Sequence, residues 1–131
     1  MTSKRLLILV VILTAMAAIF FSRAPWRGPG MVELPEEAQG RVGIQYLMAE
    51  LCSACRDMEP VLDQVKDIYG DQVLIQKIDI HAIPGTIRAY GISVVPALVV
   101  YGPDGKTRFK HEGLMTFGEL KSVLKEISGP G

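Results

Sequence analysis

The chain has 131 residues, which is enough for a single domain. Its 14 Lys and Arg residues balance its 14 Asp and Glu residues, so the overall charge argues against a nucleic-acid partner or an acidic ligand. Hydrophobic residues make up 49% of the chain, which is above the usual share once glycine is left out, and most of the excess lies at the N-terminus.

An apolar run without a charge, residues 6–21 (LLILVVILTAMAAIFF), follows Lys4 and Arg5. As a helix it would rise about 24 Å at 1.5 Å per residue, slightly less than the roughly 30 Å hydrocarbon core of a bilayer. Snorkelling basic side chains at both ends and Trp26 at the interface would make up the difference. We therefore predict a transmembrane signal anchor over residues 1–23.

A cleavable signal peptide is the alternative, because it has the same basic start and apolar centre. Residues 15–17 (AMA) offer a small-x-small cleavage pattern, but cleavage there leaves the apolar residues 19–21 near the new N-terminus. The run is also longer than the usual signal-peptide core of about 7–15 residues, so we favour the uncleaved anchor. Either form exports the rest of the chain, although Arg23 and Arg27 offset the basic residues before the run.

Residues 24–40 are rich in proline and glycine and are expected to be a linker, with a short strand near 31–34. The globular domain is then expected to cover residues 41–131.

Hydrophobic patterning predicts the elements of this domain in chain order. The expected elements are a strand over 42–49, a helix over 53–69, a strand over 73–80, a short helix over 84–90, strands over 97–101 and 106–112, and a final helix that begins with a capping box formed by Thr116 and Glu119. A helical crossover implies that the first two strands are parallel, and the turn at 102–105 (GPDG) implies an antiparallel hairpin. The predicted fold class is α/β, a mixed central sheet flanked by helices.

The two cysteines, Cys52 and Cys55, are spaced C-x-x-C where a predicted strand meets a predicted helix. Unpaired N–H groups and the helix dipole at a helix N-terminus stabilise an anion, so we expect the pKa of the Cys52 thiol below the free value of about 8.5. Cys55 lies one helical turn further on, within reach of the Cys52 sulfur. We therefore expect Cys52 to attack a disulfide as the nucleophile and Cys55 to resolve the mixed disulfide.

Two other uses of the cysteine pair are less well supported. A zinc site needs two more ligands, but His81 and His111 stand about thirty residues apart rather than three to five, so we expect no metal site in a single chain. A structural disulfide is the weaker alternative, because so short a loop restrains the unfolded chain very little.

Residues 51–65 (LCSACRDMEPVLDQV) resemble the active-site segment of the thioredoxin family, including Pro60 five residues beyond the second cysteine. The resemblance continues through residues 77–106 (KIDIHAIPGTIRAYGISVVPALVVYGPDGK), Gly113 and the last helix, and it covers about 41–131. It implies a thioredoxin-like fold and thiol–disulfide oxidoreductase activity.

By the same resemblance, Pro96 is the cis-proline that faces the active site. Val95, just before it, then offers backbone hydrogen bonds to an extended partner peptide. The alternative for Pro96 is an ordinary proline at the start of a strand.

The residues next to the cysteines depart from the thioredoxin pattern. Leu51 and the dipeptide 53–54 (SA) stand where thioredoxins have Trp and Gly-Pro. The intervening dipeptide is one of the features that set redox poise. Glu50 and Arg56 flank the pair with opposite charges and are expected to tune the thiolate, without a net direction that the sequence assigns.

A further departure concerns proton transfer. The buried Asp of the family, which is thought to manage the proton of the resolving thiol, aligns with Tyr46, so a general base is removed. Lys77 matches the family's lysine but loses its usual partner, and a solvated lysine at a strand edge is the alternative.

The leading hypothesis is a thiol–disulfide oxidoreductase, tethered to a membrane with its domain in a bacterial periplasm or at the cell exterior, or secreted if the signal is cleaved. It would act on disulfides or thiols of partner proteins, preferably as a reductase, and a membrane or soluble redox protein would recycle the pair. No cofactor beyond the redox-active disulfide is expected. A thiol module that handles Cu(I) and a docking domain without catalysis remain as alternatives.

Overall fold

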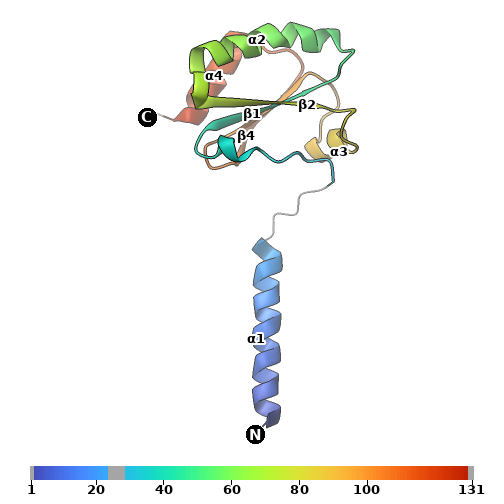
Figure 1. Ribbon diagram of the computed structural model, residues 1–131, viewed down its shortest axis with the longest axis vertical. Helices are drawn as coiled ribbons and strands as arrows, with labels where there is room; N and C mark the ends of the chain where they lie inside the picture. Colours follow the sequence, from blue (N-terminus) through green and yellow to red (C-terminus); the bar gives the residue numbers. More distant parts are fainter. Residues whose placement is uncertain (1, 24–28, 130–131) are drawn as a thin grey trace.

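The structure, a computed structural model, describes residues 2–23 and 29–129 (Figure 1). The first described part is a single helix, α1 (Thr2–Arg23). Its segment Ser3–Phe20 has a mean hydropathy of 2.1 and no residue buried inside the structure, so α1 is long and apolar enough to cross a membrane. A signal sequence has the same properties. Trp26, the expected interfacial anchor, lies outside the described residues.

The second described part is an α/β domain whose elements follow the predicted order. Within residues 29–129 these are η1 (Glu36–Ala38), β1 (Val42–Met48), α2 (Ser53–Tyr69), η2 (Gly70–Gln72), β2 (Val73–Asp79), α3 (Thr86–Tyr90), β3 (Ala97–Tyr101), β4 (Thr107–Glu112) and α4 (Phe117–Ser128). The capping box at the start of α4 is formed, with the Thr116 side chain accepting from Glu119 N–H and the Glu119 carboxylate accepting from Thr116 N–H.

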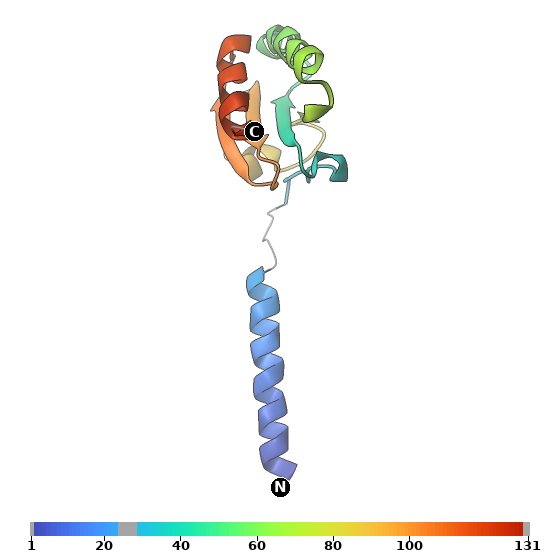
Figure 2. The same ribbon diagram turned by 90° about the vertical axis from the view of Figure 1, so that its left-hand side faces the viewer.

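The strands form one mixed sheet in the order β2-β1-β3-β4. β1 is parallel to β2 and antiparallel to β3, and β3 is antiparallel to β4. Helices α2 and α4 lie side by side on one face, and α3 lies on the other (Figures 1 and 2). The mixed sheet flanked by helices is therefore confirmed. The crossover that joins the parallel strands β1 and β2 begins with α2, so the start of α2 lies at the carboxyl end of β1, an inner strand of the sheet.

The short strand expected near 31–34 is not formed. The backbone there pairs with side chains instead of with a strand: Val32 N–H donates to the Tyr90 hydroxyl at 3.1 Å, and Val32 C=O accepts from Gln45 Nε2 at 2.9 Å. These bonds hold part of the expected 24–40 linker against the sheet. Ala38, in η1, is buried there as well.

Gln45, in the middle of β1, is the centre of this polar cluster and is fully buried. Its Oε1 accepts from the hydroxyls of Tyr90 at 2.9 Å and Tyr101 at 2.6 Å. Its Nε2 donates to Gln76 Oε1 at 2.8 Å as well as to Val32. A buried amide with both ends bonded adds stability and fixes one position for the segment that leads into the domain.

Substitution Gln45→Leu is expected to lower the free energy of unfolding by about 2–4 kcal/mol, because buried hydroxyl and carbonyl groups lose their partners. Urea unfolding of the full chain in detergent, followed by circular dichroism, measures the change. Gln72→Leu, at an exposed position of η2, is the matched control and should change little. Equal unfolding midpoints for the two variants would show that the cluster adds no stability.

Candidate active site

Cys52 and Cys55 are joined by a disulfide at the junction of β1 and α2, with their Cα atoms 5.2 Å apart. Cys52 is the N-cap of α2, and its Sγ accepts a hydrogen bond from Cys55 N–H at 3.1 Å. An N–H group that points at this sulfur stabilises negative charge on it once the disulfide is reduced. Cys55 is only 2% exposed, whereas Cys52 is partly exposed, so a partner can reach only the first sulfur.

The loop before β3 lies against the exposed sulfur. The Val95–Pro96 peptide bond is cis, as the resemblance implies. The Val95 carbonyl oxygen lies 3.9 Å from Cys52 Sγ. Pro96 is buried, and its carbonyl accepts from Gly113 N–H at 2.7 Å, so the loop that follows β4 is held beside it.

Glu112, at the end of β4, holds the backbone of this loop, and no pattern in the sequence predicts this contact. Its Oε2 accepts from Ser93 N–H at 2.7 Å and from Val94 N–H at 3.1 Å. These two hydrogen bonds, aided by the nearby charge of Lys110, hold the pKa of the Glu112 carboxyl below its usual value. The carboxylate thus holds the backbone that leads into Val95, whose carbonyl lies near Cys52.

Tyr46 lies beneath the resolving cysteine. Its side chain is fully buried, and its hydroxyl donates to the Cys55 carbonyl oxygen at 2.7 Å. Burial, together with the negative charge of Glu59, raises the pKa of Tyr46 to about 12. Tyr46 is therefore neutral near pH 7 and acts as a hydrogen-bond donor.

Lys77 is not left without a carboxylate partner. It lies on the edge strand β2, and its Nζ forms an ion pair and hydrogen bond with Glu59 Oε2. Glu59 belongs to α2 and comes four residues after Cys55. This spacing places the two side chains on the same side of a helix. The sequence position of Glu59 therefore indicated a carboxylate near Cys55, although the family pattern has its acid on the strand instead.

Glu50 and Arg56 are both exposed, on either side of the cysteine pair. Glu50 lines a cavity of about 300 Å³ with Leu51 and Cys52, and Asp79 and His81 form its other wall. The structure therefore brings Glu50 to the exposed sulfur and leaves Arg56 on the outer surface of α2.

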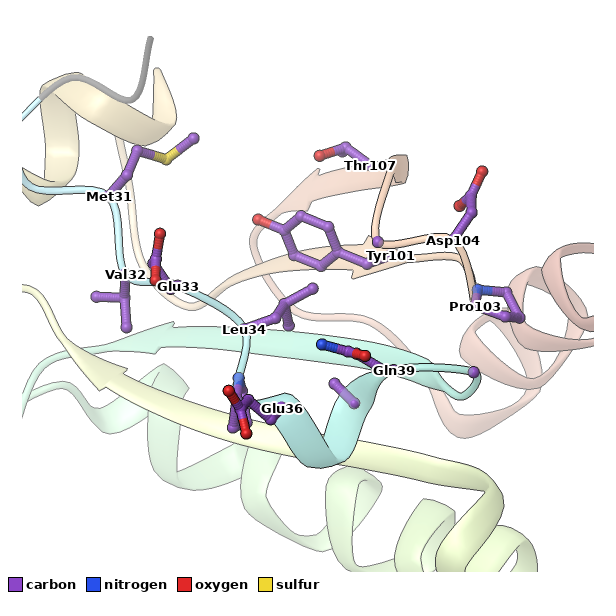
Figure 3. A pocket seen from close by; sticks show the side chains of 14 residues that line it. Met31, Val32, Glu33, Leu34, Glu36, Gln39, Tyr101, Pro103, Asp104 and Thr107 are labelled. Atoms are coloured by element: carbon purple, nitrogen blue, oxygen red, sulfur yellow. The ribbon is translucent and has the colours of Figure 1, made fainter. Parts of the chain in front are cut away.

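A larger cavity of about 860 Å³ lies between residues 31–40 and the turn that joins β3 to β4 (Figure 3). Leu34 and Tyr101 point into this region from opposite sides (Figure 3). Because Tyr101 pairs with Gly43 near the start of β1, whereas the cysteines follow the end of β1, the cavity lies at the opposite edge of the sheet from the disulfide.

The thioredoxin family model matches residues 36–126, which is more than half of the chain. The chain belongs to the thioredoxin family. A thioredoxin-like protein of Synechocystis sp. is 28% identical over 96 residues, covering 72% of this chain and 87% of that protein. The thioredoxin of Rhodospirillum rubrum is 36% identical over 58 residues, covering 44% of this chain and 55% of that protein.

Solved structures agree with this assignment. A mutant thioredoxin from Halobacterium salinarum superposes with a TM-score of 0.62 at 26% identity, covering 70% of this chain and 79% of that one. Chloroplastic thioredoxin z has the same fold, with a TM-score of 0.64 at 20% identity and coverage of 71% and 83%.

Family membership and the bonded Cys52–Cys55 pair identify this thioredoxin-family chain as a thiol–disulfide oxidoreductase. Thioredoxins carry the exchanged electrons in their cysteine pair and need no separate cofactor. Over residues 2–23 and 29–129, no three His, Cys, Asp or Glu side chains are grouped so as to hold a metal ion.

Replacing Glu112 by Gln is expected to speed hydrogen exchange at the Ser93 and Val94 amides, because a neutral amide oxygen accepts more weakly than a carboxylate. In the wild type the same loosening should appear as pH falls. A folded pKa below the unfolded value means that the stabilisation is present at higher pH and is lost as pH drops through the folded pKa.

Exchange rates, corrected for their intrinsic pH dependence, are measured by mass spectrometry on the full chain in detergent. Glu126→Gln, at an exposed position of α4, is the control and should leave the two amides unchanged. Unaltered protection in Glu112→Gln would mean that this carboxylate does not hold the loop.

Proposed function

We propose that this thioredoxin-family protein is a membrane-tethered reductase of protein disulfides. The observation that carries the proposal is the unequal burial of the two bonded sulfurs, with Cys52 partly exposed beside the Val95 carbonyl and Cys55 2% exposed behind it. We assign contact with a large partner to Cys52 and displacement of that partner from within to Cys55.

The reaction then has two exchange steps. The Cys52 thiolate attacks one sulfur of a partner disulfide, so that a mixed disulfide forms and the other partner sulfur leaves as a thiolate. The Cys55 thiol loses its proton and attacks Cys52 Sγ, which forms the intramolecular disulfide and releases the second partner thiolate. Two electrons pass to the partner, and a second redox protein must return them to the cysteine pair.

Exposed apolar side chains near Cys52 support a protein as the partner. Leu51 is fully exposed next to the nucleophile, and Val94 and Leu114 are each more than half exposed on the two neighbouring loops. An extended peptide that crosses these side chains would pair with the backbone of Val95, as a strand pairs with a sheet edge. Val95 and Pro96 would thus bind the partner, and the acidic cavity that contains Glu50 would meet the residues beside its disulfide.

The reductase direction rests on the relatives. The matching family model is that of thioredoxin, and the similar proteins from Synechocystis sp. and Rhodospirillum rubrum are a thioredoxin-like protein and a thioredoxin. A partly exposed cysteine whose sulfur receives one N–H bond suits attack on a disulfide at neutral pH.

The tether and its side of the membrane rest on α1. Lys4 and Arg5 before the apolar segment are offset by Arg23 and Arg27 after it, so the basic residues alone assign no orientation. We place the domain on the far side of the membrane because an apolar N-terminal segment with a basic start is typical of a signal for export. In a bacterial host that produces the Cys55→Ser chain, a maleimide that cannot cross the inner membrane should label Cys52 in intact spheroplasts. Labelling only after the spheroplasts are lysed would place the domain in the cytoplasm instead.

Variant Cys55→Ser is expected to accumulate a mixed disulfide with its partner, because the sulfur that resolves the intermediate is absent. Variant Cys52→Ser, the matched control, should form none, since its remaining thiol is buried. Non-reducing electrophoresis of acid-quenched membranes, followed by mass spectrometry of the excised adducts, detects them. Equal adduct yields from both variants, or adducts to Cys55 alone, would contradict the assigned roles.

A further inference from the structure

The resolving thiol must lose its proton in a place that bulk water barely reaches. Cys55 is 2% exposed and lies on the first turn of α2. A thiol reacts with a disulfide only as the thiolate, and burial among apolar groups disfavours that charge. A nearby acceptor for the proton would therefore speed the second exchange step.

Tyr46, a buried polar side chain bonded to the backbone of Cys55, is unsuited to this task. Its hydroxyl proton is already donated to the Cys55 carbonyl oxygen at 2.7 Å. The phenol can accept a further hydrogen bond but has no tendency to take a proton. It fixes the backbone of the resolving cysteine and leaves the proton to another group.

Glu59 is the carboxylate that α2 brings to the same region. It follows Cys55 by four residues, so the two Cβ atoms are about 5–6 Å apart along one face of the helix. Its Oε2 is held by Lys77 Nζ from the edge strand, and its negative charge acts on the Tyr46 phenol. The Glu59 side chain is 29% exposed, so it remains in contact with water although its charge acts on the buried Tyr46.

The charged and titratable groups around Glu59 come from three elements. Lys77 on β2 and Tyr46 on β1 face it across the sheet surface. Along α2, Cys55 and Asp63 lie four residues before and after it, and Arg56 lies three residues before it. Among these groups only Glu59 combines a free lone pair, a fixed position and the same helix face as the Cys55 thiol.

We propose that Glu59 accepts the proton of Cys55 in the resolving step, and that Lys77 is the positioning residue that fixes the Glu59 carboxylate. The inference rests on the resolving role proposed for Cys55. The proton passes from Cys55 Sγ to the Glu59 carboxylate, directly or through one water molecule, as the thiolate attacks Cys52 Sγ. The bond from Cys52 to the partner breaks, the partner leaves as a thiolate, and Glu59 returns its proton to solvent.

The two exchange steps can be timed separately in the full chain in detergent. The reduced protein is mixed with excess 5,5′-dithiobis(2-nitrobenzoate) in a stopped-flow instrument, and released thionitrobenzoate is followed by absorbance. Attack by Cys52 gives a first phase that depends on reagent concentration. Resolution by Cys55 gives a second phase that does not. The variants are Glu59→Gln, Glu59→Asp and, as a matched loss of a carboxylate on the same helix, Asp63→Asn.

Glu59→Gln should slow the second phase about 100-fold or more near neutral pH, as expected for the loss of a positioned general base, and leave the first phase unchanged. The difference in second-phase rate between Glu59→Gln and the wild type should shrink towards about pH 10, because hydroxide then removes the thiol proton instead. Glu59→Asp keeps a carboxylate and should recover part of the rate. Asp63→Asn should resemble the wild type in both phases.

A second phase that is as fast in Glu59→Gln as in the wild type, or faster, would overturn the inference. If Glu59 were only a neighbouring negative charge, its removal would favour the Cys55 thiolate, and Glu59→Gln would resolve as fast as the wild type or faster. A second phase slowed equally at every pH, without recovery in Glu59→Asp, would show a packing defect and would also overturn it. A wild-type chain with no second phase would instead contradict the resolving role of Cys55 and hence the proposed function.

Discussion

The geometry of the site depends on one constraint, the placement of the cysteine pair at the first turn of a helix that starts from the central strand. Because Cys52 caps α2, its sulfur receives the N–H group of Cys55 and stays at the surface. Because Cys55 is already inside the helix, its side chain points into the core. The parallel pairing of β1 with β2 and the antiparallel return of β3 then bring Val95 to the exposed sulfur.

The buried polar groups behind this pair differ from the pattern that the thioredoxin resemblance implies. A tyrosine occupies the strand position of the family's acid, and it donates a hydrogen bond to the backbone of Cys55. The carboxylate comes from the helix instead, at Glu59, and it retains the pairing with Lys77. Charge balance in this region is therefore kept although the residues that provide it have changed.

Much of this arrangement could be predicted from the sequence, because it follows from local patterns. Apolar periodicity and the capping box at Thr116 located α2 and α4, and the helical crossover predicted the parallel pair. What could not be predicted depends on contacts between distant side chains. The segment near 31–34 is apolar enough for a strand, yet its backbone bonds to Gln45 and Tyr90, which are distant in sequence. Glu112 lies in a strand of alternating polarity, and its hydrogen bonds to the backbone of Ser93 and Val94 depend on how the strand and the loop pack together.

The reduction potential of the Cys52–Cys55 pair tests the central claim most directly. The full chain in detergent is equilibrated in thiol buffers of graded potential, and its free thiols are alkylated and counted by mass. A reductase of protein disulfides predicts a reversible two-electron transition near the roughly −270 mV of thioredoxin. A value near the roughly −120 mV of DsbA would mean an oxidant, and the lack of any reversible disulfide would contradict thiol–disulfide exchange altogether.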